Sequence, residues 1–119
     1  MGLFTPAQAR TALTRLRPVL DELVAVRADV VELAAALAGG EPTGIGGLPE
    51  WKAAEAKLDE LMTEVRETGV ELKGLAPLLV DFPADLDGMP VYLCWLEGEA
   101  ELAWYHRTDL GFAGRRRLP

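Results

Sequence analysis

Apolar residues recur at a helical period through the first third of the chain. The recurring positions are Leu13, Leu16, Leu20, Leu23, Val30, Ala34 and Leu37, and Arg27 alone interrupts them. A spacing of about 3.5 residues is typical of a helix that packs one narrow face against another helix. Thr5-Pro6-Ala7-Gln8 suits a helix start, because threonine and glutamine can form a capping box around a proline at the first helical position. Gly39-Gly40 suits a helix end, so the pattern predicts a helix over residues 6–38.

A second run with the same period follows a glycine-rich segment. Residues 39–48 hold five glycines and one proline, a composition that is typical of a flexible connection. The recurring positions of the second run are Trp51, Ala54, Leu58, Leu61, Val65, Thr68 and Leu72. Pro49 suits the first helical position and Gly69 suits the residue after a helix, so a second helix is expected over residues 49–69. The two narrow apolar faces predict an antiparallel helical hairpin.

From Leu78 onward apolar and polar residues alternate, which is the period of a strand. The first strand is expected from Leu78 to Phe82, because Pro83 cannot donate a hydrogen bond to a neighbouring strand. We therefore expect residues 70–119 to form a small sheet and a C-terminal turn. Residues 1–119 would then be a single α+β domain, in which a long antiparallel helical hairpin carries a small antiparallel β-sheet at the C-terminal end.

The main hairpin of this sheet is expected around Glu97-Gly98. A two-residue loop that ends in glycine suits the tight turns of hairpins, and it would pair residues 91–96 with residues 99–106. Residues 84–88, which include an Asp-Gly pair, are expected to form a turn between the first strand and this hairpin.

The register of that hairpin decides which side chains share a face. Trp95 and Trp104 would lie on the apolar face, and alternation puts His106 on it as well. Cys94 would lie on the other face, out of hydrogen-bond reach of His106, so a thiol nucleophile is not expected. A cysteine between apolar residues is typically a small buried hydrophobe. One face of the hairpin can pack on the helices, which leaves the other for a ligand or a partner.

Composition and charge narrow the functional classes. The chain has 12 lysines and arginines against 19 acidic residues, a net charge of −7, whereas proteins that bind nucleic acids usually present a basic face. A single cysteine excludes a disulfide within the chain. No apolar run approaches the roughly 20 residues of a membrane span, and the start of the chain lacks the pattern of a signal peptide. We therefore expect a cytoplasmic protein without a membrane or nucleic-acid partner.

His106 is the only histidine, and histidine is the side chain whose ordinary pKa lies nearest neutrality. Glu99 and Asp109 are close to it in sequence, and a histidine with two carboxylates can bind a metal ion or act as an acid or base. A single histidine at a strand end more often donates a structural hydrogen bond to a carboxylate or a carbonyl. The chain lacks Cys-x-x-Cys and His-x-x-x-His spacings, so no particular metal ion or cofactor is predicted.

Arg115 follows a glycine-containing turn that would return it toward the sheet. Six acidic residues and no basic residue lie between positions 75 and 105, so Asp81, Glu99 or Asp109 is the expected partner. Structural pairing is one interpretation, and capture of a ligand carboxylate or phosphate is the other. The candidate ligand or partner site comprises His106, Glu99, Asp109, Arg115, Asp81 and Tyr105.

Several motifs in the last third of the chain resemble one bacterial family. They are Val80-Asp81-Phe82-Pro83, Leu93-Cys94-Trp95, Gly98-Glu99, Tyr105-His106 and Gly111-Phe112-Ala113-Gly114-Arg115. In this combination, and with Phe4-Thr5 and the helix that follows, the chain resembles the domain-of-unknown-function family 2203 over nearly its whole length. The resemblance implies a small bacterial protein built from a helical hairpin and a sheet. It supplies no activity and no catalytic residues.

These observations support two functional hypotheses. The first is a non-enzymatic interaction module that self-associates through its helices. A monomer would expose Val19, Val24, Val26, Val31 and Leu33, which lie off the narrow face, and a homodimer of two hairpins would bury them. The second is a protein that binds a small molecule or a metal ion, or an enzyme, with a site around His106, Glu99, Asp109 and Arg115. A cavity that holds those four groups within contact distance would favour the second hypothesis.

Overall fold

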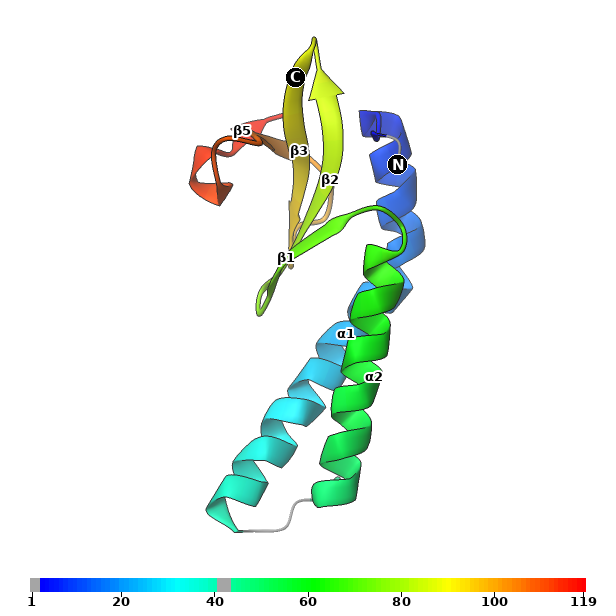
Figure 1. The fold of residues 1–119 in the computed structure, drawn as a ribbon, viewed down its shortest axis with the longest axis vertical. Helices are drawn as coiled ribbons and strands as arrows, with labels where there is room; N and C mark the ends of the chain where they lie inside the picture. The colour runs from blue at the N-terminus through cyan, green and yellow to red at the C-terminus, as the bar shows by residue number, and fades with distance from the viewer. Residues whose placement is uncertain (1–2, 41–43) are drawn as a thin grey trace. The chain divides into compact units, whose positions relative to one another are not determined.

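The computed structural model describes residues 3–40 and 44–119, and within them it has two helices followed by five strands (Figure 1). The elements are α1 (Pro6–Gly39), α2 (Leu48–Arg66), β1 (Glu71–Leu75), β2 (Leu78–Leu86), β3 (Met89–Leu96), β4 (Trp104–Arg107) and β5 (Arg116–Arg117), with a short 3-10 helix at Phe112–Gly114 before β5. The predicted α+β class, with two packed helices and then an antiparallel sheet, is confirmed. Neither helix has an apolar stretch that would let it cross a lipid bilayer, as judged on the described residues.

The chain forms two compact units, and the boundary between them falls within α1. The helical unit is Arg17–Glu64, and the sheet unit combines Met1–Leu16 with Val65–Pro119. In the helical unit the apolar faces of α1 and α2 meet as the periodicity predicts, with Leu20, Leu23 and Leu61 almost fully buried.

One expectation about the helical unit is wrong, because Leu33 is buried rather than exposed. Leu33 lies three residues after Val30 and is therefore its neighbour on the same helix face. Val31 is 64% exposed, as expected. The apolar face of α1 is thus broader than the strict 3.5-residue spacing suggests.

The sheet unit is a five-stranded antiparallel meander in the described residues, with the order β1-β2-β3-β4-β5. A two-residue turn joins β2 to β3, and both of its residues have positive φ, 53° at Asp87 and 84° at Gly88. This is the backbone of the tight turn that Asp-Gly pairs favour. The Asp-Gly pair therefore joins two paired strands directly.

The expectation that Pro83 ends the first strand is wrong, because β2 continues through Pro83 to Leu86. Pairing with β1 extends only as far as Asp81. The Pro83 carbonyl points to this vacated side, where it accepts a hydrogen bond of 2.8 Å from the Phe4 amide. The nitrogen and the carbonyl of one strand residue point to the same side. The missing N–H of Pro83 therefore removes no hydrogen bond between β2 and β3.

The predicted hairpin around Glu97-Gly98 is also wrong. A turn at that position would set Val91 opposite Trp104, but Val91 pairs with Arg107, a displacement of three residues. The chain does turn at Gly98, but residues 97–103 then form a longer connection before β4. The Glu97 side chain fixes the start of this connection by accepting a hydrogen bond of 2.8 Å from the Leu78 amide.

A displacement by an odd number of residues transfers every side chain of a strand to the other face of the sheet. Trp95 and Trp104 therefore lie on opposite faces, and His106 shares a face with Cys94 rather than with Trp95. The inner face is a continuous apolar layer of Leu78, Val80, Phe82, Ala84, Val91, Leu93 and Trp95, each at most 3% exposed. Phe4, just before α1, packs its ring edge-on against Phe82, with 5.4 Å between centroids. The outer face carries the polar residues described next.

Candidate functional site

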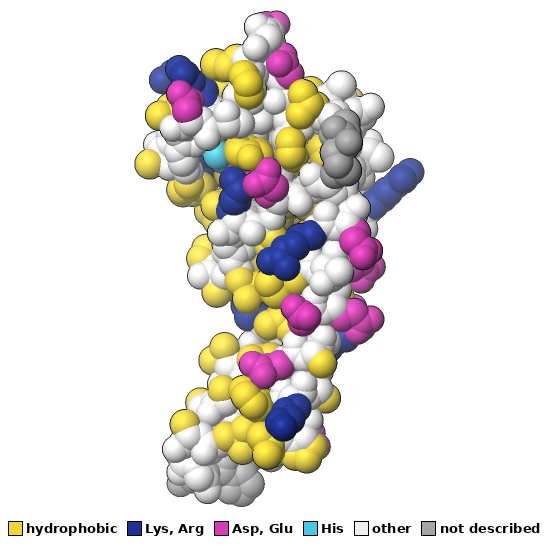
Figure 2. Space-filling view, in the orientation of Figure 1, with side chains coloured by type: hydrophobic (Ala, Val, Ile, Leu, Met, Phe, Trp, Pro, Cys, Tyr) yellow, Lys and Arg dark blue, Asp and Glu magenta, His cyan; other side chains and the backbone are white. Residues whose placement is uncertain are grey.

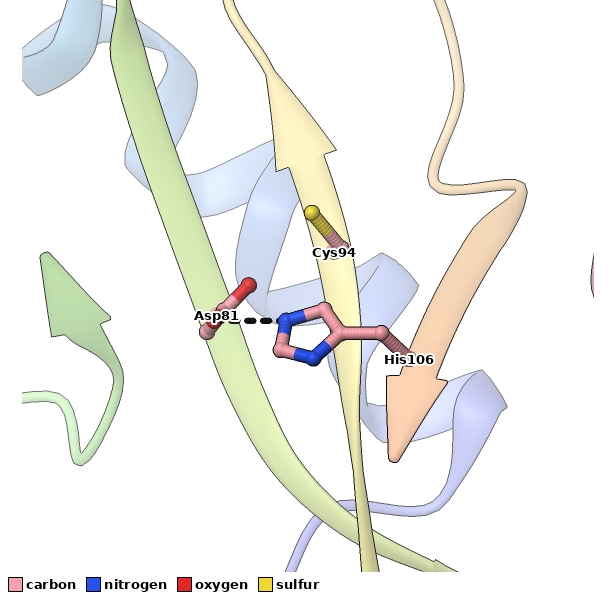
Figure 3. A group of neighbouring side chains, drawn as sticks. All are labelled: Asp81, Cys94 and His106. Atoms are coloured by element: carbon pink, nitrogen blue, oxygen red, sulfur yellow. Dashed lines mark hydrogen bonds and ion pairs between the residues drawn. The ribbon is translucent and has the colours of Figure 1, made fainter. Parts of the chain in front are cut away.

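Three neighbouring strands each place one chemically versatile side chain on the outer face of the sheet (Figure 3). Asp81 of β2 pairs directly with Cys94 of β3, and His106 of β4 pairs with Tyr92, two residues before Cys94. Asp81, Cys94 and His106 are 1%, 0% and 4% exposed. One oxygen, sulfur or nitrogen atom from each lies within 4.8 Å of the other two. The sheet thus brings three possible ligand atoms together in a buried position.

Both ring nitrogens of His106 face hydrogen-bond acceptors. Nδ1 lies 3.0 Å from the Arg107 carbonyl oxygen and 2.9 Å from the Leu110 carbonyl oxygen, so it carries a hydrogen and donates it. Nε2 lies 3.0 Å from Oδ2 of Asp81. A neutral imidazole has only one N–H, so Nε2 would then direct its lone pair at a carboxylate oxygen. The short contact therefore requires an additional proton, or another cation, between His106 and Asp81.

Lys73 links the Asp81–His106 pair to Glu71 and Tyr92. Its ammonium group lies 3.3 Å from Oδ2 of Asp81 and 3.6 Å from Oε1 of Glu71, and it sits 4.0 Å from the centre of the Tyr92 ring. Partial burial lowers the pKa of Lys73, but the charge and hydrogen bond of Asp81 together with the charges of Tyr92 and Glu71 outweigh it, and the net shift of the pKa is upward. The Tyr92 hydroxyl donates a hydrogen bond of 2.7 Å to Glu71, which raises the pKa of Tyr92. Lys73 therefore stays a cation within this network.

Oδ1 of Asp81 stands apart from these contacts. It is buried and has no oxygen or nitrogen hydrogen-bond partner among the residues that the structure describes, and the Cys94 thiol, a weak donor, lies next to this carboxylate. Buried polar atoms without a partner are uncommon in folded proteins, and each one calls for an explanation. The outer face thus contains a carboxylate whose Oδ2 is paired with His106 and Lys73 and whose Oδ1 is unsatisfied.

Cys94 is close to His106 but is not activated by it. Burial raises the pKa of the thiol to about 12, and the negative charge of Asp81 contributes to the same shift. The two nitrogens of His106 are already directed at backbone carbonyls and at Asp81. The expectation that the sheet separates Cys94 from His106 is wrong, yet the geometry still disfavours a thiol–imidazole nucleophile.

A cavity of about 330 Å³ opens over this part of the outer face. Its floor includes Lys73, Asp81, Tyr92 and His106, and residues 108–112 form one wall. Leu110 accepts the hydrogen bond from His106 through its carbonyl while its own side chain is 43% exposed. The wall is therefore anchored to the histidine by its backbone and is apolar at its rim.

The structure divides the predicted site residues among three places. Asp81, His106 and Asp109 line the cavity, but Asp109 binds Arg107 with contacts of 3.0 and 2.7 Å rather than His106. Glu99 forms a separate ion pair with Arg115, whose Nη2 lies 2.7 and 2.9 Å from its two carboxylate oxygens.

Arg115 also lies over aromatic rings, 4.9 Å from the Trp104 centre and 4.8 Å from the Phe112 centre. This geometry matches the structural-pairing interpretation with Glu99, one of its three expected partners. Tyr105 pairs with Leu93 and thus belongs to the inner face. The four groups His106, Glu99, Asp109 and Arg115 therefore do not form one cluster.

Sequence reasoning missed Lys73, Tyr92 and Cys94 as members of this site. One signal was present in the Asp87-Gly88 pair. Counting outward from a two-residue turn at that position places Asp81 opposite Cys94, as observed. Lys73 carried no comparable signal, because its place depends on the pairing of β1 with β2.

The comparisons with known proteins identify a family without assigning a function. Neither the curated proteins nor the solved structures contain a significant match. Residues 2–118 match the family model described as "Uncharacterized conserved protein (DUF2203)". Because the match covers almost the entire chain and agrees with the motifs of its last third, this chain belongs to the DUF2203 family.

Proposed function

We propose that this protein is a binding module whose ligand occupies the cavity on the outer face of the sheet. The observation that carries the proposal is the Asp81 carboxylate, which is 1% exposed and has an unsatisfied Oδ1 among the described residues. Burial of a carboxylate is unfavourable unless its oxygens are paired. A ligand that supplies the missing partner explains why the outer face retains this group.

The charges around the cavity favour a ligand that is cationic or that donates hydrogen bonds. Asp81 and Glu71 supply two negative charges, and Lys73 supplies one positive charge close to both. Arg107 and Asp109 pair with each other at the wall. Once the proton between His106 and Asp81 is displaced, these groups carry an excess of negative charge in a partly buried position, where charges interact more strongly than in water.

Binding fits this geometry better than thiol-based catalysis. Cys94 is held as a protonated thiol by its burial, and its pKa of about 12 leaves almost no thiolate near neutral pH. A nucleophilic cysteine instead needs a lowered pKa or an adjacent base that is free to accept its proton. We therefore propose that the site binds its ligand and has a non-enzymatic role.

A ligand screen by thermal melting tests the proposal on untagged protein. A panel of metal ions, amines and small polar molecules should include at least one that raises the melting temperature of the wild type. Asp81→Asn should lose that response, while Asp59→Asn, an exposed acid in α2, should keep it. A panel without any stabilising ligand, or an unchanged response in Asp81→Asn, would contradict the proposal.

We also propose that the protein self-associates through its helical unit as a homodimer. Among the described residues of this unit, four large apolar side chains are exposed, namely Val31, Leu37, Ile45 and Leu48. Hydrophobic side chains gather on the face of the unit seen in the lower part of Figure 2. Sedimentation equilibrium at micromolar concentration should give twice the 12.9 kDa chain mass, and Val31→Glu should lower it. A wild-type species at the mass of one chain would refute the dimer.

Two further proposals concern nucleic-acid partners and the location of the protein in the cell. A net charge of −7 repels nucleic-acid phosphates, so we propose that nucleic acids are not partners. A free, buried thiol is compatible with the reducing cytoplasm of a bacterium, where we place the protein. Gel-shift assays at low salt and cell fractionation check these two points.

A further inference from the structure

We propose that the ligand is a divalent transition-metal ion of the zinc class, held by Asp81 and His106, which line the cavity, and by the buried Cys94 next to them. This inference rests on the proposed binding function and names its ligand. The first support is the donor set, which offers one carboxylate oxygen, one thiolate sulfur and one imidazole nitrogen. Zinc accepts all three donor types, whereas magnesium and calcium strongly prefer oxygen ligands.

The distances fit one ion after a small adjustment. Zinc bonds oxygen, nitrogen and sulfur at about 2.0 to 2.3 Å, so that tetrahedral donors lie roughly 3.3 to 3.8 Å apart. His106 Nε2 and Asp81 Oδ2 are 3.0 Å apart, and all three donor atoms lie within 4.8 Å of one another. Side-chain rotations that move the donor atoms by about 1 Å would bring them to bonding distance. The three donors come from three adjacent strands, which hold them in place.

The hydrogen bonds of His106 are those of a metal ligand. A metal-binding histidine usually donates its second N–H to a backbone carbonyl or a carboxylate, which fixes the tautomer and directs the other nitrogen at the ion. Nδ1 of His106 donates in this way to the Leu110 carbonyl at 2.9 Å. Nε2 is thereby directed at Oδ2 of Asp81, 3.0 Å away, where an ion can take the place of the shared proton.

Asp81 provides the second, independent indication. Its side chain is 1% exposed, and Oδ1 lacks a partner among the described residues, although Oδ2 is close to both His106 and Lys73. A carboxylate can bind an ion through either oxygen. An ion that lies between His106 and Oδ2 would satisfy Oδ1 as well if the Asp81 carboxylate bound it through both oxygens.

The charges of the three ligands balance a divalent ion, and the neighbouring Lys73 and Glu71, 3.6 Å apart, balance each other. A thiolate from Cys94 and a carboxylate from Asp81 supply two negative charges, and a neutral His106 adds none. Binding releases two protons, one from the thiol and one from between His106 and Asp81. The ion gains three bonds to protein and replaces the shared proton. Three protein ligands leave a fourth position, and because Asp81 and His106 line the cavity, water or a small molecule can reach it there.

Cobalt titration of the untagged, metal-free protein tests this site, because cobalt reports its ligands in the absorption spectrum. The wild type should bind one Co²⁺ per chain with the visible bands of a tetrahedral site and a near-ultraviolet thiolate-to-cobalt band, and Zn²⁺ should displace it. Cys94→Ser should abolish the thiolate band, and Asp81→Asn and His106→Gln should each weaken zinc binding at least tenfold. Asp109→Asn, an acid of the same cavity that is paired with Arg107, should bind zinc as the wild type does.

Circular dichroism identifies any variant that fails to fold. If a variant fails to fold, the alkylation rate of Cys94 in the wild type tests zinc binding instead, because bound zinc should slow this reaction at least tenfold. A wild type without the cobalt spectrum, a thiolate band that survives in Cys94→Ser, or alkylation that ignores zinc would overturn the inference. A non-metal ligand that raises the melting temperature through Asp81, without any metal effect, would refute only the metal. Absence of every ligand effect would refute the binding function as well.

Discussion

The two faces of the same small sheet are built on opposite principles. The inner face is a closed apolar layer in which no side chain from β2 or β3 named above is more than 3% exposed. The outer face is buried almost as deeply at Asp81, Cys94 and His106, yet it contains a carboxylate, a thiol and an imidazole. Burial of apolar area stabilises a fold directly, whereas a buried ion pair is often no better than apolar residues of similar volume. The inner face thus makes the fold, and the contrast supports our proposal that the outer face is retained for binding.

The largest effect should come from the inner face. Phe82→Ala removes a fully buried ring that contacts Phe4 at 5.4 Å between centroids. We expect a loss of about 3–5 kcal/mol in the free energy of unfolding, as for other large core aromatics. Urea unfolding followed by circular dichroism measures it. A loss below about 1 kcal/mol would show that the inner face is not the core of this unit.

The next prediction tests whether the buried polar groups of the outer face stabilise the fold or are kept for binding. Asp81→Ala leaves His106 and Lys73 without their shared partner, and breaking a buried pair costs about 3–5 kcal/mol. The double variant Asp81→Leu/His106→Leu removes both polar groups at once. We expect it to unfold with about the wild-type free energy, or to be more stable, because apolar residues often replace buried pairs without loss. A double variant that is less stable than Asp81→Ala would mean that the pair serves the fold.

The smallest effect concerns Cys94 and alkaline pH. Its folded-state pKa of about 12 lies above the ordinary value of 9.0, so the buried thiol stabilises the fold below about pH 9 and loses that contribution as the pH rises toward 12. Unfolding then releases a proton, and the free energy of unfolding should fall by up to about 1.4 kcal/mol per pH unit. Cys94→Ala should lack this component. Parallel urea titrations of both proteins from pH 8 to pH 10.5 measure the difference, and identical slopes would contradict it.

The helical part of the fold was predictable because its boundaries are encoded locally. Thr5 and Gln8 form the expected capping box, in which the Thr5 amide donates to the Gln8 side chain at 3.0 Å and the Gln8 amide donates to the Thr5 hydroxyl at 3.1 Å. Gly40, just after α1, has a φ of 71°, which is the left-handed conformation typical after a helix. These contacts span three residues or fewer, so sequence pattern alone identifies them.

The candidate site was less predictable because it depends on strand register. Asp81 and His106 are 25 residues apart, and a displacement of three residues in one hairpin was enough to move His106 to the wrong face. The sequence offers two X-Gly turns, Asp87-Gly88 and Glu97-Gly98, and only the first joins paired strands directly. The second leads into a connection fixed by side-chain hydrogen bonds, among them the one from Leu78 to Glu97. Such bonds have no periodic signature.

The most direct test of the binding account compares thermal melting with and without Zn²⁺ in the wild type and in Asp81→Leu/His106→Leu. A ligand at 100 times its dissociation constant stabilises a folded protein by about 2.7 kcal/mol. The account predicts that zinc raises the melting temperature of the wild type by several degrees. It predicts no zinc effect on the double variant, even though that variant is at least as stable without metal. An equal zinc response in both proteins, or none in either, would contradict the claim that the outer face is retained to bind a metal ion.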